Sequence, residues 1–490
     1  MNNEVIRPFS PSSHALKKTP TGIAGLDEIT EGGLPAGRST LICGGAGCGK
    51  TLFSVEFLAR GILDYNEPGV IMAFEETAED LAQNVASLGY DLDKMQADKM
   101  LLIDHVRLDK NDIEETGDFD LEGIFIRLGH AIDTLGAKRV VLDTLETLFA
   151  GITNTMILRS ELRRLFRWLK DKGVTSIITA ERGEGKLTRH GMEEYVSDCV
   201  ILLDNRVINQ VTTRRLRIVK YRGSIHGTNE YPFLIDNSGI TVMPVTSLKL
   251  EHAVSSERVS TGIEKLDEML SGKGYLKGST VLALGSAGTG KTSISASFAK
   301  SVCESGKKCL YFAFEESPNQ IMRNMKSIGC DLEPYVEKGC LQFFASRPTV
   351  YGLEMHLVMM HKAIEEFKPD VVIVDPMTNL IAVGDFVEVK TMLTRLIDFL
   401  KVNMVTALFT ALVQTESFFA GTIEGISSLI DTLILVRNIE QNNEMHRGIC
   451  VVKSRGMSHS NKIREFIIAE DGIDIQDFVP LVTNNNFINL

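Results

Sequence analysis

The chain has 490 residues, of which 44% are hydrophobic and 24% charged, and it carries a net charge of −12. This is the composition of an ordinary globular protein, and the acidic balance argues against a protein that coats a nucleic-acid backbone, which needs basic stripes. Residues 1–20 lack the apolar core of a secretory signal, and no apolar run approaches the roughly 20 residues of a membrane-spanning helix. We therefore expect a cytoplasmic protein whose partners are neither membranes nor nucleic acid.

Short β-branched runs alternate with helical patterns along both halves of the chain. Helical patterns at 51–63 and 77–87 separate the first runs, and residues 216–221 and 449–454 are typical of an added antiparallel hairpin late in each half. Alternation of this kind predicts an α/β fold with a mostly parallel, twisted sheet flanked by helices. In the first half the predicted strands are residues 39–43, 70–73, 101–104, 140–143, 176–179 and 200–204.

The pattern Gly-x-x-x-x-Gly-Lys-Thr occurs twice, and its two lysines, Lys50 and Lys291, lie 241 positions apart. Each copy follows a short apolar run, which is the strand–loop–helix setting of a phosphate-binding loop. Glycines let the backbone N–H groups point inward at phosphate oxygens, the lysine reaches the outer phosphates, and the threonine hydroxyl ligates Mg²⁺. The expected nucleotide-binding residues are Gly45, Ala46, Gly47, Cys48, Gly49, Lys50, Thr51 and Leu52 in the first copy, and Ser286, Ala287, Gly288, Thr289, Gly290, Lys291 and Thr292 in the second.

The duplication extends beyond these loops. Residues 21–28 are echoed by 261–268, and Lys-Tyr-Arg-Gly at 220–223 pairs with Lys-Ser-Arg-Gly at 453–456, where the offset has fallen to 233. The chain is therefore predicted to hold two homologous domains in tandem. The expected segments are a flexible N-terminus at 1–15, a first domain at 16–247, a second domain at 248–480 and a short tail at 481–490, with the polar stretch 244–260 as the linker.

Asp143 and Asp375 each end an apolar strand downstream of a phosphate-binding loop. This is the usual place for the carboxylate that holds hydrated Mg²⁺ near the phosphates, together with Thr51 and Thr292. Either aspartate alone could instead be the N-cap of a following helix. Their common position in the two halves favours the metal role.

Paired glutamates, Glu75-Glu76 and Glu315-Glu316, also end apolar strands, at the carboxyl edge where ligands bind in open α/β sheets. Hydrolysis needs a carboxylate that orients or deprotonates water, and phosphoryl transfer to protein needs one that accepts a hydroxyl proton. The alternative is that the two acids cap the next helix. Because both halves keep the pair at the same place, we favour the catalytic interpretation.

Lys220 and Arg222 alternate along a strand, so that both side chains point to one face, and Lys453 and Arg455 repeat the pattern. Such a pair could be a solvated strand edge. It could also supply cations that neutralise charge on a nucleotide held by a neighbouring subunit. Periodicity alone does not decide between these two interpretations.

Neither the other basic runs nor the cysteines predict a further site. Residues 159–167 have the pattern of an amphipathic helix with a solvated face, and 214–217 resemble an alternating strand. The eight cysteines lack Cys-x-x-Cys spacing, so we expect small, reduced, apolar residues.

Three features together resemble the KaiC family: the run Gly-Gly-Leu-Pro-Ala-Gly-Arg-Ser-Thr at 32–40, the Phe-Glu-Glu strand ends, and the Lys-x-Arg-Gly segments. The resemblance covers about residues 16–478. It implies tandem RecA-like ATPase domains that assemble as a homohexameric double ring, with ATP and Mg²⁺ bound between subunits. It also implies slow ATP hydrolysis in the first ring, and autokinase and autophosphatase activity in the second. The resemblance adds Lys220, Arg222 and His226, and Lys453, Arg455 and His459, to the ATP-binding residues.

The family's phosphorylated pair corresponds here to Ser427 and Ser428, just before the Asp-Thr of a strand. Without the resemblance, two serines at that place would be read as an ordinary loop. Aligning Asp198 with Asp431 places Glu194 and Tyr195 at the equivalent positions of the first half. We therefore predict that phosphorylation is confined to the second domain.

The resemblance also bears on partners. Clock-forming members carry a longer C-terminal extension that KaiA grips, and this chain stops soon after Phe478, so control by KaiA is not expected. The region that the family uses for KaiB, around 150–160, is present with a different sequence. A KaiB-like partner at the first ring therefore remains open.

The leading hypothesis is a KaiC-like ATPase and autokinase that acts as a phosphorylation-based timer or stress-signalling switch. One alternative is a RecA-type recombination or repair ATPase, which would need basic pore loops and usually an accessory DNA-binding domain. Another is a hexameric scaffold that uses ATP only to assemble, although the glutamate pairs argue against it.

Overall fold

The computed structural model describes residues 16–106, 122–149, 155–183, 185–188, 191, 196–208, 211–244, 254–413, 428–441 and 443–478. The predicted N-terminal segment and tail thus lie outside the described residues. The chain divides into two compact units, Met1–Thr246 and Ser247–Leu490, and each is described here by itself. None of the described helices combines the length and the apolar character that crossing a bilayer requires.

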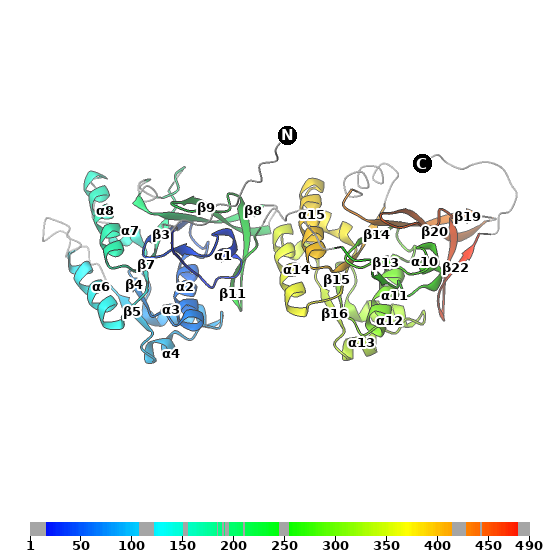
Figure 1. Ribbon diagram of the computed structural model, residues 1–490, viewed down its shortest axis with the longest axis horizontal. Helices are drawn as coiled ribbons and strands as arrows, with labels where there is room; N and C mark the ends of the chain where they lie inside the picture. The colour runs from blue at the N-terminus through cyan, green and yellow to red at the C-terminus, as the bar shows by residue number, and fades with distance from the viewer. Residues whose placement is uncertain are drawn as a thin grey trace, which may run out of the picture. The chain divides into compact units, whose positions relative to one another are not determined.

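The first unit is built on one sheet of nine strands in the order β11-β10-β9-β8-β3-β7-β6-β4-β5. The six strands from β8 to β5 run parallel, and β9, β10 and β11 continue the sheet with antiparallel pairing (Figure 1). A two-stranded β1–β2 ribbon is separate. The strands are β1 (Lys18–Thr19), β2 (Leu34–Pro35), β3 (Ser39–Gly44), β4 (Gly69–Ala73), β5 (Leu101–His105), β6 (Arg139–Asp143), β7 (Thr175–Glu181), β8 (Cys199–Ile208), β9 (Val211–Tyr221), β10 (Glu230–Asp236) and β11 (Gly239–Val242). The helices are α1 (Leu26–Ile29), α2 (Lys50–Tyr65), α3 (Ala78–Ala86), α4 (Leu92–Ala97), α6 (Glu122–Leu135), α7 (Leu145–Leu148) and α8 (Thr155–Asp171).

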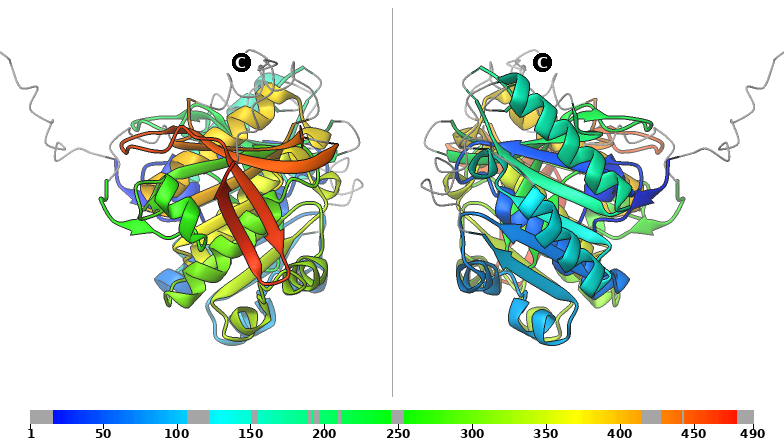
Figure 2. Two further views of the ribbon diagram at one scale, coloured as in Figure 1. Left: turned by 90° about the vertical axis from the view of Figure 1, so that its right-hand side faces the viewer. Right: turned by 90° about the vertical axis from the view of Figure 1, so that its left-hand side faces the viewer.

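The parallel strands read as continuous apolar runs because both faces of the sheet are covered. Along β3, Leu41 belongs to the hydrophobic cluster that contains Leu128 of α6, whereas the next residue, Ile42, belongs to the cluster that contains Phe53 of α2. Figure 2 (right) shows α6 and α8, in cyan and teal, lying over one face of the sheet. Successive side chains of one strand therefore supply two separate cores.

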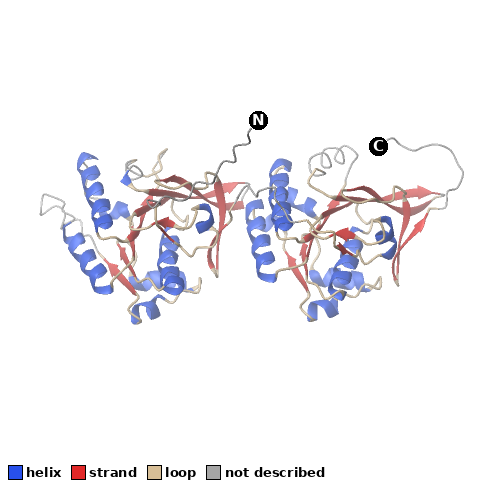
Figure 3. Cartoon of the chain, viewed as in Figure 1, coloured by secondary structure: helices blue, strands red, loops and turns tan. Residues whose placement is uncertain are grey.

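The second unit repeats this architecture, with the strand order β16-β15-β17-β18-β14-β19-β20-β21-β22 (Figure 3). The same six positions are parallel, and the last three strands are again antiparallel. Its strands are β12 (Arg258–Val259), β13 (Tyr275–Leu276), β14 (Thr280–Gly285), β15 (Cys309–Ala313), β16 (Leu341–Ala345), β17 (Val371–Asp375), β18 (Thr406–Leu412), β19 (Thr432–Gln441), β20 (Glu444–Ser454), β21 (Arg464–Ala469) and β22 (Gly472–Asp477). Its helices are α10 (Glu264–Met269), α11 (Lys291–Glu304), α12 (Pro318–Lys326), α13 (Glu333–Glu337), α14 (Leu353–Phe367) and α15 (Phe386–Val402), with 3₁₀ turns η1 (Pro348–Val350) and η2 (Met377–Val383).

The predicted fold class is confirmed, with two α/β units built on mixed, mostly parallel sheets. Two details differ from the expectation. The predicted linker 244–260 is too long, because Arg258 already pairs with Leu276 in β12–β13 and its guanidinium donates to Gly274 O at 2.9 Å. The last hairpin of each unit, β10–β11 and β21–β22, was not predicted, because β11 has only four residues and β22 lacks a continuous apolar run.

Candidate nucleotide-binding sites

The loop between β3 and α2 has the backbone that a phosphate-binding loop needs. Gly47 has φ 70° and Gly49, the N-cap of α2, has φ 101°, values that L side chains rarely adopt. A Cβ added to Gly45 or Gly47 would meet no atom within 4 Å, so the space above the loop is open. An open cradle at a helix N-terminus suits an anion. In the second unit Gly288 and Gly290 repeat these dihedral angles, at 74° and 97°.

The two loop lysines are held in the same way. Lys50 Nζ donates to Gly44 O and Gly45 O, both at 3.0 Å. Lys291 Nζ donates to Gly285 O at 2.9 Å and to Ser286 O at 2.7 Å, and burial lowers the pKa of Lys291 while Asp375 and Glu315 oppose that shift. Each ammonium group therefore lies inside its loop, where it could meet the outer phosphates.

Asp143 lies at the carboxyl end of β6 and is only 6% exposed. Thr179 donates a short hydrogen bond to Asp143 Oδ1. Burial raises the pKa of Asp143, and hydrogen bonds from Thr179 and Thr51 oppose the shift. Asp375 receives the equivalent short bond from Thr410. In the first unit, the Asp143 carboxylate beside the Thr51 hydroxyl is an oxygen-donor pair that fits Mg²⁺.

The aspartates do not cap helices. The N-cap of α7 is Thr144, and that of η2 is Pro376. The helix-cap alternative for Asp143 and Asp375 is therefore wrong.

The glutamate pairs follow β4 and β15, next to the aspartate strands in each sheet. Glu75 Oε1 accepts from Thr147 Oγ1 at 2.7 Å and from Thr144 Oγ1 at 3.1 Å. Glu76 accepts from Asn84 at 3.2 Å, and burial raises its pKa, with that hydrogen bond acting in the opposite direction.

In the second unit Glu316 accepts from Asn324 at 3.3 Å, as Glu76 does from Asn84. The helix-capping alternative is wrong for these pairs too. Thr77 caps α3 in a capping box with Asp80, and Ser317 caps α12 in a capping box with Gln320.

The Lys/Arg pairs lie near the amino ends of the parallel strands, the opposite end from the phosphate-binding loop and the carboxylates. Lys220 pairs across with Val200, near the start of β8, and Val200 is level with Leu41 near the start of β3. The phosphate-binding loop begins only after β3 ends, so at ~3.3 Å per residue it lies on the order of 10 Å further along the strands. Lys453, opposite Leu433 on β19, repeats this placement. The structure therefore brings the loop, the aspartate and the glutamates together in each unit, but not the Lys/Arg pair.

Both pairs contact the segment just before the neighbouring strand. Lys220 Nζ donates to Ser197 O at 2.7 Å, and Lys453 Nζ donates to Ile430 O at 2.8 Å. Arg455 donates to Ser428 O at 2.8 Å. Burial lowers the pKa of Lys453, and Arg455 adds to that shift.

The remaining predicted site residues are placed as follows. His226 is half-buried beside Tyr221, and its Nδ1 lies 2.9 Å from Gly227 O. His459 is half-buried in the equivalent segment after β20, and Ser428 is exposed. Ser427, Glu194, Tyr195 and residues 150–154 of the region expected to meet KaiB lie outside the described residues.

Sequence reasoning missed the side chains that hold the carboxylates, namely Thr179, Thr410, Asn84 and Asn324. The duplication carries a signal for them. Asn84 and Asn324 are 240 positions apart, the same offset as Glu76 and Glu316, and both threonines lie on the strand next to the aspartate strand. Polar residues that recur at one place in two otherwise divergent copies could have been identified as supports of the site.

All eight cysteines are free, as expected. Cys48, in the first loop, is buried, and burial raises the pKa of its thiol. It therefore packs as an apolar residue and is not a reactive thiolate.

Comparisons with known proteins agree with this geometry. A family model described as "ATPase: KaiC" matches residues 19–247 and 259–478. The chain is 55% identical over 465 residues to "Circadian clock protein KaiC2" of Synechocystis sp., covering 94% of this chain and 82% of that relative. It is 38% identical over 481 residues to "Circadian clock oscillator protein KaiC" of Synechococcus elongatus, covering 97% and 92%. The chain belongs to the KaiC family of ATPases.

Proposed function

We propose that the protein is a hexameric, Mg²⁺-dependent ATPase whose second domain is also a serine autokinase and autophosphatase. We further propose that its phosphorylation state acts as a timing or stress-signalling switch; the timing role is supported by the relatives named as circadian clock proteins. A KaiB-like protein is the proposed partner of the first ring.

The proposal assigns the same nucleotide-binding roles in both units. The loop amides, with Lys50 or Lys291, bind the phosphates of ATP, and Thr51 with Asp143, or Thr292 with Asp375, hold Mg²⁺. A bound Mg²⁺ ion would neutralise charge that develops on the transferred phosphoryl group. The glutamate pairs act as bases: Glu75 or Glu76 orients water for hydrolysis, and Glu315 or Glu316 accepts the hydroxyl proton of a serine.

The separation of the Lys/Arg pair from the phosphate-binding loop and aspartate of the same unit is the observation that carries the proposal. Within one chain, Lys453 and Arg455 lie at the amino edge of the sheet, whereas Lys291 and Asp375 lie at the carboxyl edge. A Lys/Arg pair that cannot reach its own nucleotide can serve one held by another copy, which is the head-to-tail contact from which rings are built. His226 and His459 follow these pairs and would meet the same neighbouring nucleotide.

Ser428 lies beside Arg455, at the same amino edge. A serine there is remote from the phosphate-binding loop of its own unit. If Arg455 reaches the nucleotide of a neighbouring subunit, Ser428 lies close to that nucleotide as well. We propose Ser427 and Ser428 as the acceptors, phosphorylated from ATP that the neighbouring subunit holds.

The test is phosphopeptide mapping after incubation of the pure protein with Mg·ATP, alongside Glu315→Gln, with Glu75→Gln as the matched control in the first unit. We expect phosphate on Ser427 or Ser428 in the unmodified protein and in Glu75→Gln, and its loss in Glu315→Gln. ATP hydrolysis without phosphate on either serine would refute the kinase and leave the ATPase.

A further inference from the structure

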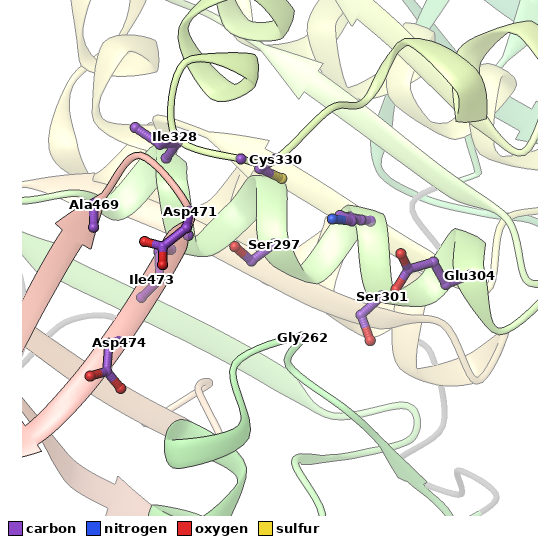
Figure 4. A pocket seen from close by; sticks show the side chains of 13 residues that line it. Gly262, Ser297, Ser301, Glu304, Ile328, Cys330, Ala469, Asp471, Ile473 and Asp474 are labelled. Carbon is purple, nitrogen blue, oxygen red and sulfur yellow. The ribbon is translucent and has the colours of Figure 1, made fainter.

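A cavity of about 330 Å³ lies in the second unit, far along α11 from the phosphate-binding loop. Three segments surround it: the C-terminal half of α11, the loop after α12, and the β21–β22 hairpin. Figure 4 shows Ser297, Ser301 and Glu304 projecting from α11, with Cys330 and Asp471 opposite them. The hairpin is drawn in orange and red in Figure 2 (left).

The first unit has the same three segments but fills this space with its own side chains. The residues equivalent to Ser297, Ser301 and Cys330 are Glu56, Arg60 and Tyr90. Glu56 is 1% exposed and accepts from Ile240 N at 2.7 Å, and Arg60 donates to Ser238 O at 3.0 Å. An ion pair of 3.6 Å joins Arg60 to Glu56. We call Glu56, Arg60 and Tyr90 the plug.

The space beside the glycine at the hairpin turn differs between the two units. A Cβ built on Gly239 would lie 2.3 Å from Glu56 Oε1 and 2.7 Å from Tyr90 Oη. A Cβ built on the equivalent Gly472 would meet no atom within 4 Å. The plug therefore occupies the space over Gly239, and the same space over Gly472 is open.

The second unit also has charged residues at four positions around the open space where the first unit has uncharged ones. Lys300, Glu304 and Asp471 line the cavity, together with Asp474. Their first-unit equivalents are the uncharged residues Ala59, Leu63, Ser238 and Thr241. Compared with the first unit, the second lacks the internal carboxylate–guanidinium pair. It has one ammonium group and three carboxylates around the open cavity instead.

We propose that this cavity is a binding site for a small zwitterion of the basic amino acid class, which supplies in trans the guanidinium and carboxylate that the plug supplies in the first unit. The guanidinium of the ligand lies against Asp471, Asp474 or Glu304, and its carboxylate lies against Lys300. A volume of this size is at the lower end of small-molecule sites, which suits a free amino acid better than a macromolecule. The site is separate from the residues assigned to ATP and does not rest on the proposed kinase.

The test is calorimetric titration of the full chain in Mg·ATP with L-arginine, with agmatine, which lacks the carboxylate, and with L-glutamate, which lacks the guanidinium. We expect saturable binding of one L-arginine per chain, agmatine weaker by about tenfold or more, and no binding of L-glutamate. Absence of saturable L-arginine binding overturns the proposal, and equal affinity for agmatine overturns the role of Lys300.

The site is located by transplanting the plug. The triple variant Ser297→Glu, Ser301→Arg, Cys330→Tyr should fill the cavity and abolish binding, and L-arginine binding that survives in it overturns the location. Should that variant not fold, Ser301→Arg alone places one long side chain at a half-buried position and should weaken binding by about tenfold; unchanged affinity would then refute the site. Glu337→Gln, which removes an exposed carboxylate elsewhere in the same unit, is the control and should bind normally.

Discussion

At the scale of single residues, the two aspartate sites are not equal. Both accept a short hydrogen bond from a threonine, but Asp375 Oδ2 also accepts from Tyr311 Oη at 2.6 Å. The residue equivalent to Tyr311 in the first unit is Ile71, which has no polar group. Tyr311 is fully buried, so its hydroxyl can only be satisfied inside the protein.

We predict that Tyr311→Phe destabilises the second unit by about 1–3 kcal/mol, because it leaves a buried carboxylate oxygen without a donor. Tyr275→Phe is the matched control. Tyr275 is also fully buried in the second unit, and within the described part of the chain its hydroxyl has no hydrogen-bond partner. Urea-dependent hydrogen exchange of the amides of β14 and β15 in the full chain gives both stabilities. Equal effects of the two substitutions would contradict the importance of the Tyr311–Asp375 bond.

At the scale of elements, α2 and β6 pack together because a large buried side chain on β6 faces a glycine on α2. Arg139 at the start of β6 is fully buried and donates to Phe57 O and Pro20 O, each at 2.8 Å. It fits because Gly61 of α2 has no side chain: a Cβ there would lie 2.4 Å from Arg139 Cδ. The second unit has Val302 and Val371 at these two places, and both belong to its hydrophobic core.

We predict that Gly61→Val alone destabilises the first unit by about 2 kcal/mol, because the added volume forces Arg139 away. Arg139→Val alone is also destabilising, since Phe57 O and Pro20 O lose a donor and Glu67 loses its ion pair. The double variant recreates the valine pair of the second unit and should cost less than the sum of the two, with a coupling energy of about 1 kcal/mol. Chemical unfolding of the unsubstituted protein, the two single variants and the double variant gives the coupling energy. If the two destabilisations simply add, residues 61 and 139 are not coupled in the way proposed.

The elements that the sequence predicted well are those that local pattern determines. The runs that became β3, β4 and β6 are apolar on both faces, and the glycine-rich loops need particular dihedral angles, so both are legible in a few residues. What was missed depends on contacts between distant positions. Nothing near Glu56 shows that it meets Ile240, 184 positions away, and the neighbours of Ser297 do not show that the same space is empty in the second unit.

At the scale of the whole molecule, each unit keeps the predicted nucleotide-binding residues in two separate groups. The loop and carboxylates lie at one edge of the sheet, while the Lys/Arg pair, and in the second unit Ser428, lie at the other. Lys453 is level with Leu282 of β14, and Asp431 N donates to Thr280 O at its start. At ~3.3 Å per residue the loop after Gly285 therefore lies on the order of 10 Å from Lys453 and on the order of 15 Å or more from the segment that holds Ser428, along the strands. Under the proposed function, phosphoryl transfer therefore joins two chains.

We predict that two inactive chains restore each other. Lys291→Ala lacks the ammonium group that we propose to bind the phosphates, and Ser427→Ala/Ser428→Ala lacks the proposed acceptors, so neither variant alone should be phosphorylated. In mixed rings, ATP held by the serine-less chain faces the intact serines of a Lys291→Ala neighbour, and phosphate should appear on the Lys291→Ala chain, which isotope labelling identifies by mass. Native mass spectrometry confirms that mixed rings have formed. As the control, the Lys291→Ala chain is mixed with a chain that carries all three substitutions, and this mixture should give no phosphate. If the unsubstituted protein is phosphorylated but mixed rings carry no phosphate, transfer occurs within one chain, and the proposed transfer between neighbours is wrong.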